Sequence, residues 1–272
     1  WFPIRQRLIG IWLRFYKKNV ISNVYKASGD KRVLLYYKTD PFFSKGAVNL
    51  YTHTNNAEIL IISNLFKKHG FIVDVVYRNA NWDEIITLQE NYYDIFFGIG
   101  SGNFKYFNKI KSEFKVGKTV IIGTGPEPLL SNNFVNKAHN DCKKRNNYDF
   151  LTRRLVIGSE ESIRERYLQV DAVFYYGNNW NKKNWGVVTN NLYNIFPSTS
   201  PNIEFSLKDL HLKQKNRFLY FAANGLICKG LDLVIEAFDG LDGVFLDICA
   251  PFDEIDFWRF YKPIVDRNKS IN

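Results

Sequence analysis

Short apolar runs alternate with amphipathic stretches from position 31 onward. The apolar runs predict six strands, at 31–38, 71–77, 93–100, 118–125, 171–178 and 191–199. The stretches between the first four runs predict helices, at 55–70, 81–92 and 103–114. Helices that alternate with short apolar strands indicate a parallel sheet with helices on both faces. The sequence therefore predicts an α/β fold.

The same rhythm restarts near the end of the chain. The segment PSTSPNIEFSLKD (197–209) is typical of a linker, and strands are then expected at 217–223 and 243–251, with helices at 230–238 and 253–265. The sequence thus predicts an α/β domain at 31–200 and a second one at 201–272. Two strands are too few for a sheet of normal size, so we expect the second domain to be incomplete in this chain or to be completed by a partner.

The segment before these domains, residues 1–30, is basic and amphipathic. Its opening letters, WFPIRQRLIGIWLRFYKKN, predict a helix from about Pro3 to Lys18 with one apolar stripe. Such a helix either packs on the domain or lies in the interface of an anionic membrane. No apolar run reaches the roughly 20 residues of a membrane-spanning helix. We therefore expect a cytoplasmic protein, peripheral at the inner membrane face if this helix binds lipid.

Charge and composition narrow the partners further. The 37 Lys and Arg residues against 27 Asp and Glu give a net charge of +10, which suits anionic partners without choosing among them. No zinc-finger, RNP or basic-zipper pattern is present, so nucleic acid is not the favoured partner. The 3 Cys and 4 His residues are dispersed, which predicts neither disulfides nor a bound metal. Residue 1 is Trp and the count of Met is 0, which indicates either an internal fragment or Met positions left out of the sequence.

Loops that follow strands are the candidate ligand sites, because open parallel sheets bind ligands at the carboxyl ends of their strands. The first such loop, TDPFFSKGAVNLYTHTNN, is unusually long for an α/β unit. Gly46 lets the backbone approach a ligand, Lys45 can meet an anion, and His53 stands near the start of the next helix. The alternative for His53 is a surface residue beside a helix cap.

Two further loops are rich in glycine, GIGSGN (98–103) and GTGPEP (123–128). Neither is a full G-x-G-x-x-G fingerprint, so no dinucleotide cofactor is predicted. Either can simply be a tight turn. Glu127 differs, since a carboxylate between two prolines at a strand end is held in a rigid turn. It is a candidate general base or ligand of a sugar hydroxyl, and the alternative is an exposed surface carboxylate.

The strongest signal is GLICKG (225–230), which follows a strand and opens a helix. Free backbone N–H groups and the positive end of the helix dipole are expected to point at one spot there. Lys229 adds a full positive charge. The spacing is not that of a Walker loop. By spacing alone, a phosphate site and a plain turn remain equally good interpretations.

The stretch FAANGLICKGLDLVIEAF (221–238) resembles the opening of the nucleotide-sugar-binding domain of retaining GT-B glycosyltransferases, where a strand runs into a G-x-x-x-K-G turn and a helix like LDLLIEAF. The following GVFLDICAP, with Asp253 and Glu254 after it, is similar to the next strand and helix start of such enzymes. VIIGTGPEPLLSNN and RRLVIGSEE look like parts of a GT-B acceptor domain.

This resemblance implies two facing Rossmann-like domains, with the donor in the C-terminal one and the acceptor in the N-terminal one. Lys229 would bind the donor diphosphate, Gly225 and Gly230 would allow its approach, and Gly46 would border the same phosphate. Glu127 lies where the family often places an acceptor-side or catalytic residue. A lysine and a helix N-terminus stabilise a departing nucleoside diphosphate without a metal. The implied function is sugar transfer from a nucleotide sugar to a glycan or lipid-linked acceptor, with no cofactor.

Two departures from the family pattern motivate an alternative. Ala223-Asn224 stands where the family often has a basic residue before its lysine. The family's E-x7-E segment, whose carboxylates address the donor, is not found in these 272 residues. The alternative is therefore a noncatalytic nucleotide- or sugar-binding module that keeps a GT-B-like shell.

Overall fold

The computed structural model describes residues 18–43, 54–99, 105–167, 170–197 and 215–272. The chain forms two compact units, a first of Trp1–Leu129 with Ile157–Pro201 and a second of Leu130–Val156 with Asn202–Asn272. This division differs from the domains predicted at 31–200 and 201–272, because the segment Leu130–Val156 belongs with the C-terminal residues.

The first unit is built on a seven-stranded mixed sheet with the order β1-β3-β2-β4-β5-β6-β7. Its strands are β1 (Val20–Ile21), β2 (Lys31–Tyr37), β3 (Phe71–Tyr77), β4 (Tyr92–Ile99), β5 (Lys115–Gly123), β6 (Ala172–Tyr176) and β7 (Leu192–Ile195). The six strands from β2 to β7 are parallel, and β1 pairs antiparallel with β3. The α/β class and these six strands are confirmed, whereas the two-residue β1 was not predicted.

The central strands are buried on both faces, which explains their almost continuous apolar sequences. A charged exception is Asp74 in β3, which is 0% exposed. Its carboxylate accepts hydrogen bonds from the Asn23 backbone N–H at 2.6 Å and from the Tyr93 hydroxyl at 2.8 Å. Because a buried carboxylate requires such partners, Asp74 ties the residues just after β1 to the sheet.

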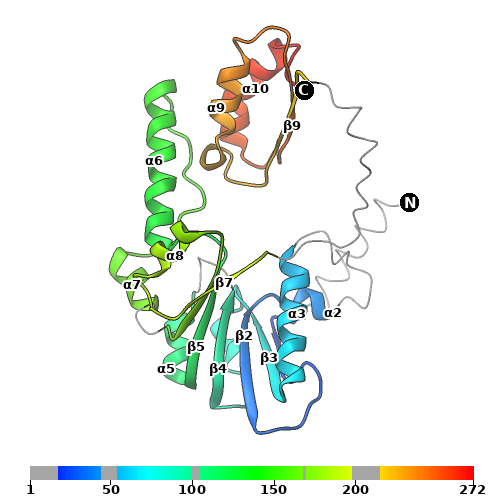
Figure 1. Ribbon diagram of the computed structural model, residues 1–272, viewed down its shortest axis with the longest axis vertical. Helices are drawn as coiled ribbons and strands as arrows, with labels where there is room; N and C mark the ends of the chain where they lie inside the picture. The colour runs from blue at the N-terminus through cyan, green and yellow to red at the C-terminus, as the bar shows by residue number, and fades with distance from the viewer. Residues whose placement is uncertain (1–17, 44–53, 100–104, 168–169, 198–214) are drawn as a thin grey trace, which may run out of the picture. The chain divides into compact units, whose positions relative to one another are not determined.

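Six described helices accompany this sheet: α2 (Asp40–Phe43), α3 (Thr54–Lys68), α4 (Trp82–Ile85), α5 (Phe107–Glu113), α7 (Glu160–Tyr167) and α8 (Asn179–Trp185). In Figure 1, α3 lies on the near face of the sheet and α5 on the far face. Helix α8 was not predicted. It begins at Asn178, whose side chain caps it by accepting a hydrogen bond from the Trp180 backbone N–H at 2.9 Å.

The helix predicted at 81–92 is wrong in length, because α4 ends at Ile85. Beyond it the Leu88 N–H bonds the carbonyl of Ile85 at 3.1 Å, a tight three-residue turn instead of a helical one. The Thr87 hydroxyl also donates to the carbonyl of Glu84 at 2.6 Å, which competes with helical pairing.

The second unit contains α6 (Pro128–Asn146) from Leu130 onward, the parallel pair β8 (Arg217–Phe221) and β9 (Phe245–Cys249), the short 3₁₀ turn η2 (Ile227–Lys229), α9 (Leu231–Phe238) and α10 (Ile255–Arg267). The last residues run parallel to β9, since the Leu246 N–H bonds the Ser270 carbonyl at 2.7 Å and the Ile248 N–H bonds the Asn272 carbonyl at 2.9 Å. The two predicted strands and two predicted helices of this region are confirmed.

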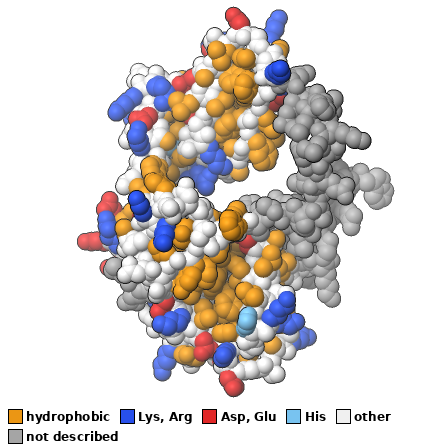
Figure 2. Space-filling view, in the orientation of Figure 1, with side chains coloured by type: hydrophobic (Ala, Val, Ile, Leu, Met, Phe, Trp, Pro, Cys, Tyr) orange, Lys and Arg blue, Asp and Glu red, His pale blue; other side chains and the backbone are white. Residues whose placement is uncertain are grey.

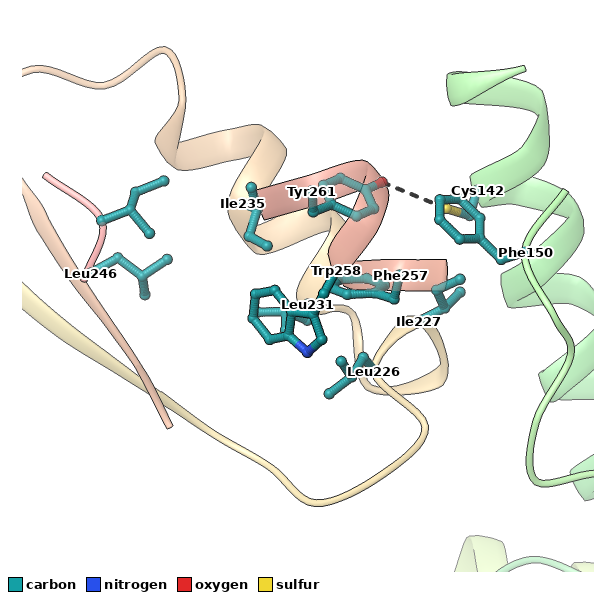
Figure 3. Close-up of a cluster of buried hydrophobic side chains, with 11 residues drawn as sticks. Cys142, Phe150, Leu226, Ile227, Leu231, Ile235, Leu246, Phe257, Trp258 and Tyr261 are labelled. Carbon is teal, nitrogen blue, oxygen red and sulfur yellow. Dashed lines mark hydrogen bonds between the residues drawn. The ribbon is translucent and has the colours of Figure 1, made fainter. Parts of the chain in front are cut away.

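The core of the second unit joins α9 and α10 to the segment that contains α6. Figure 3 shows Phe257 and Tyr261 of α10 facing Phe150 and Cys142. Tyr261 stacks on Phe150 with ring centroids 5.9 Å apart, and its hydroxyl lies 3.6 Å from the Cys142 sulfur. This burial is the reason that Leu130–Val156 belongs to the second unit.

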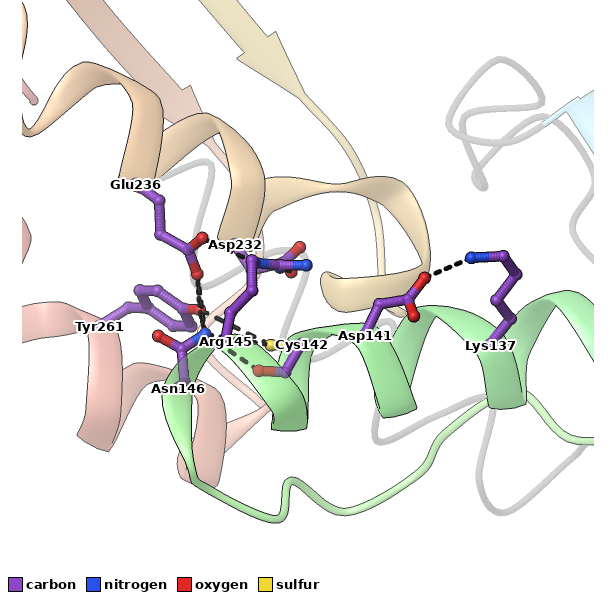
Figure 4. A network of polar contacts seen from close by, with 8 residues as sticks. All are labelled: Lys137, Asp141, Cys142, Arg145, Asn146, Asp232, Glu236 and Tyr261. Atoms are coloured by element: carbon purple, nitrogen blue, oxygen red, sulfur yellow. Dashed lines mark hydrogen bonds and ion pairs between the residues drawn. The ribbon is translucent and has the colours of Figure 1, made fainter.

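Polar contacts fix α6 to the same core (Figure 4). Arg145 donates to the carboxylates of Asp232 and Glu236, the latter at 2.9 Å. Asn146 donates to the hydroxyl of Tyr261 at 2.8 Å. The sequence predicts a helical stretch to about Arg145, with loop as the alternative for part of its polar run, and the structure shows a helix through residue 146. Arg145 and Asn146 at its end have partners on α9 and α10.

One face of β8 is largely exposed among the described residues. Leu219 and Phe221, which point to the same side of the strand, are 69% and 78% exposed. In the view of Figure 2, hydrophobic side chains gather over the second unit.

Among the described helices, none combines the length and the apolar character needed to cross a membrane. The amphipathic segment predicted from Pro3 to Lys18 falls almost wholly outside the described residues.

Candidate functional site

The turn between β8 and α9 has the strand, turn and helix order that the sequence predicts. Gly225 and Gly230 adopt φ angles of +90° and +75°, the left-handed region that favours glycine. The Lys229 N–H bonds back to the carbonyl of Leu226 at 3.2 Å, which closes the 3₁₀ turn, and also to that of Gly225 at 3.0 Å. Both glycines are thus required by the backbone itself, before any ligand is considered.

Several backbone N–H groups of this turn have partners within the protein, contrary to the prediction. Glu254, only 4% exposed, accepts hydrogen bonds from the N–H groups of Gly225 and Leu226. The N–H groups of Gly230 and Leu231 bond carbonyl oxygens at 2.9 and 3.0 Å. The protein therefore places its own carboxylate where a bound anion was expected, because buried amides require an acceptor.

A second cation reaches the end of β8 from a distant part of the sequence. The guanidinium of Arg154 donates to the carbonyl of Asn224 at 3.0 Å. A Cβ atom built on Gly225 would clash with Cδ of Arg154, so the glycine makes room for the arginine stem. Arg154 itself has a φ of +69°, a left-handed conformation that is strained for a residue with a side chain. Arg154 supplies a positive charge beside Ala223-Asn224, where the sequence has none.

Lys229 lies next to this arginine. Its ammonium group donates to the carbonyl of Ala223 at 3.0 Å, and its side chain is exposed. Burial, together with the charge of Arg154, lowers the pKa of Lys229. In the described part of the chain, no carboxylate oxygen lies within 4.0 Å of either cation. Two neighbouring cations without an acidic partner attract an anion.

Three candidates from the first loop, Lys45, Gly46 and His53, lie outside the described residues. The loop's described flanks carry polar groups of their own. Lys38, just after β2, donates to the side-chain oxygen of Asn56 in α3 at 3.3 Å. Since β2 has β3 on one side and β4 on the other, its carboxyl end is the point of the sheet where ligands are expected.

Sequence reasoning missed a buried acid near this edge. Glu58 of α3 is 6% exposed and accepts a hydrogen bond from the hydroxyl of Tyr176 in β6 at 2.8 Å. Burial, and then the charge of Glu58, raise the pKa of Tyr37 in β2. The sequence did contain a signal, because Glu58 stands directly before the apolar run ILII. An acid on the buried face of a helix requires a specific partner.

Glu127 is not the exposed carboxylate of the alternative interpretation, since it is 8% exposed. Its Oε1 atom accepts a hydrogen bond from the Leu129 backbone N–H at 3.1 Å, which caps the start of α6. Earlier in the same loop, the Trp185 indole N–H donates to the carbonyl of Gly125 at 2.9 Å. The indole ring lies 2.5 Å from where a Cβ atom of Gly123 would stand. Gly123 of GTGPEP therefore accommodates a tryptophan, and the Gly125 carbonyl binds its indole N–H.

One cluster of described residues has ligand types suited to a metal. Cys142, Asp232 and Glu236 place one ligand atom each within 4.8 Å of one another. Arg145 donates to both carboxylates of this cluster. Its guanidinium thus supplies the positive charge that a metal ion would otherwise bring.

No protein-family model matches the chain, and no curated protein matches it by sequence.

Proposed function

We propose that the protein is a metal-independent, retaining glycosyltransferase that moves a sugar from a nucleotide-sugar donor to a glycan or lipid-linked acceptor. The observation that carries the proposal is Lys229, a cation at the carboxyl end of β8 with no carboxylate partner in the described residues. It stands at the position that the family resemblance assigns to the donor diphosphate. Two facing Rossmann-like domains are part of the same proposal.

Charge development during the reaction gives Lys229 a role. When the bond to the sugar breaks, negative charge builds on the departing nucleoside diphosphate, and a nearby ammonium stabilises this state more than the ground state. Among the described residues, Lys229 donates only to the backbone carbonyl of Ala223, so its ammonium has further N–H donors for a phosphate oxygen. Gly225 and Gly230 shape the turn that presents it.

The acceptor side of the proposal rests on the first unit. Glu127 is the candidate catalytic residue, and Lys45, Gly46 and His53 are candidates of the loop after β2. Glu127 serves in this role only if its carboxylate leaves the Leu129 N–H. The bonded pair of Glu58 and Tyr176 is a further polar contact of this unit.

Nucleotide binding tests the proposal. Titration calorimetry on the full chain with UDP, GDP and ADP should show saturable binding of at least one, and Lys229→Gln should weaken it about tenfold. Lys137→Gln is the matched control, since Lys137 is an exposed lysine of α6 that pairs only with Asp141 in the described structure. Absence of binding to all three nucleotides, or equal affinity of wild type and Lys229→Gln, contradicts the proposal.

The noncatalytic binding module remains a second candidate because of one observation. Glu254 occupies the two backbone N–H groups that a phosphate would otherwise use. A module of this kind would bind the nucleotide through side chains alone and release no sugar. Incubation with UDP-, GDP- and ADP-sugars separates the two candidates: sugar transfer or hydrolysis supports the enzyme, and binding without product supports the module.

A cytoplasmic position at the inner membrane face belongs to the proposal as well. Its basis is the basic amphipathic sequence at the start of the chain. Flotation with anionic liposomes should show binding that is lost when residues 1–20 are removed. Equal flotation of both forms excludes this segment as the anchor.

A further inference from the structure

We propose that Arg154 is the second cation of the nucleotide-binding site, and that it and Lys229 together hold the two phosphates of a diphosphate. This inference rests on the proposed function and extends it to a residue 75 positions away in sequence. The two side chains bond adjacent carbonyl oxygens, those of Ala223 for Lys229 and of Asn224 for Arg154, each at 3.0 Å. They therefore meet at one place, the end of β8.

Arg154 is held in position before any ligand arrives. Its stem lies against Gly225, its guanidinium bonds the Asn224 carbonyl, and its backbone is in the left-handed region at φ +69°. An arginine fixed in this way loses little conformational entropy when it binds an anion. Only one bond of its guanidinium is to a described residue, whereas the group has five N–H donors in a planar fork that suits phosphate oxygens.

The neighbouring arginines of the second unit are already neutralised. Arg153 lies 3.6 Å from a carboxylate oxygen of Asp256 and 4.0 Å from one of Glu254. Arg145 is paired with Asp232 and Glu236. Among the described residues, Arg154 has no carboxylate partner within 4.0 Å, and it is close enough to Lys229 for its charge to lower the pKa of that lysine, which the charge of Glu254 raises. Two cations held together at a cost in repulsion favour a ligand with more than one negative charge.

The contact with Gly225 offers a way to move Arg154 without removing its charge. A methyl group at position 225 would occupy the space of the Arg154 stem, so Gly225→Ala should displace the guanidinium. Gly243→Ala is the matched control, because Gly243 has a similar φ of +70° but no atom within 4 Å of a Cβ built there. Both substitutions carry the strain of a left-handed alanine, and only the first touches the arginine.

The experiment measures binding of inorganic pyrophosphate, inorganic phosphate and the nucleoside diphosphate that wild type binds, by calorimetry on the full chain at low salt. We expect Arg154→Gln to weaken the binding of pyrophosphate and of the nucleoside diphosphate about tenfold, and to weaken the binding of phosphate less. With Gly243→Ala as the reference, Gly225→Ala should weaken the binding of both ligands by a similar factor. The double variant Gly225→Ala with Arg154→Gln should bind them no more weakly than Arg154→Gln alone. Arg259→Gln, an exposed arginine of α10, should bind as wild type does.

The outcomes separate this inference from the proposed function. If wild type binds the nucleotide and Lys229→Gln weakens it, but Arg154→Gln has wild-type affinity, the inference is wrong and the proposed function stands. If wild type binds pyrophosphate through Arg154 but no nucleoside diphosphate, the anion site stands and the glycosyltransferase proposal fails. Arg154→Lys, which keeps the charge and loses the planar fork, should fall between wild type and Arg154→Gln, and it replaces Arg154→Gln as the test if that variant does not fold.

Discussion

Both carboxylate oxygens of Glu254 lie 3.3 Å from the backbone nitrogen of Leu226. The carboxylate also accepts from the Gly225 N–H, so a buried acid at the start of α10 holds the turn after β8. The turn is consequently preformed without a ligand, and its two exposed cations, Lys229 and Arg154, are presented from a fixed backbone. A ligand at this place would contact side chains and not the first two amides of the turn.

Replacement of Glu254 tests this arrangement. Glu254→Ala leaves two buried N–H groups without an acceptor, and we expect it to cost about 1–3 kcal/mol in the free energy of unfolding of the second unit. Amide hydrogen exchange at Gly225 and Leu226 should accelerate, and urea unfolding should shift to lower concentration. The control Asp266→Asn removes a carboxylate that is 57% exposed and should change neither measurement. Unchanged exchange at residues 225 and 226 in Glu254→Ala would contradict the assignment.

Substitutions of Glu127 separate a helix cap from a catalytic group. Glu127→Ala removes the acceptor for the Leu129 N–H and should destabilise the protein by about 1 kcal/mol, whereas Glu127→Gln keeps an oxygen there and should cost less. Thermal unfolding measures this difference, and equal stability of wild type and Glu127→Ala would rule out the cap. A loss of about 10²-fold in sugar transfer by Glu127→Gln, at unchanged stability, would support the general-base role.

Gly123→Ala tests the packing of the GTGPEP loop. The added methyl group would lie 2.5 Å from the indole ring of Trp185, which is 0% exposed and cannot move into solvent without loss of burial. Such overpacking should cost about 1–3 kcal/mol in unfolding free energy. The control is Gly240→Ala, at a position with nothing within 4 Å of the new methyl group. If the two variants unfold at the same urea concentration, Gly123 is not constrained by Trp185.

Acidification should weaken the second unit through His139 of α6. Burial lowers the pKa of His139 from its ordinary value of 6.5, against the carboxylates of Glu254, Asp232 and Asp256, which raise it. The folded state therefore favours the neutral imidazole, so this contribution to stability is present above pH about 6.5 and is lost as the pH falls through the lowered pKa. As the pH is lowered from about 7 to about 5, the urea concentration at the unfolding midpoint should decrease, and this decrease should be smaller in His139→Gln.

The matched control for this titration is His69→Gln, since His69 is an exposed histidine at the end of α3. Its pH dependence should equal that of wild type. An identical decline in wild type and His139→Gln would show that other groups cause the acid sensitivity.

Much of the fold was predictable because it depends on local patterns. The parallel strands are buried on both faces, so strands such as β2 and β3 appear in the sequence as unbroken apolar runs. Gly70, with φ +80°, ends α3 where the sequence placed it. Helix α8 and the early end of α4 were not predictable, because a side-chain cap at Asn178 and a tight turn at Leu88 decide them in sequences without clear periodicity.

The candidate site was predictable only in part. The motif GLICKG identified the turn and the exposed lysine, since a strand, two glycines and a helix start are local features. It did not reveal that Glu254 fills the amides or that Arg154 lies against Gly225, because both come from other segments of the chain. Glycine at 225 was attributed to ligand approach, and the structure gives it a second reason in the arginine stem.

By itself, the sequence determined the α/β class, the positions of the strands and the place of Lys229 at a strand end, because backbone preference and burial periodicity act over a few residues. Only the tertiary structure decided that Leu130–Val156 belongs with the C-terminal residues. It also decided which charges are paired, with Arg145 and Arg153 neutralised and Arg154 beside Lys229. Those outcomes depend on contacts between residues 70 or more positions apart, such as Arg154 with Asn224, which no local pattern encodes.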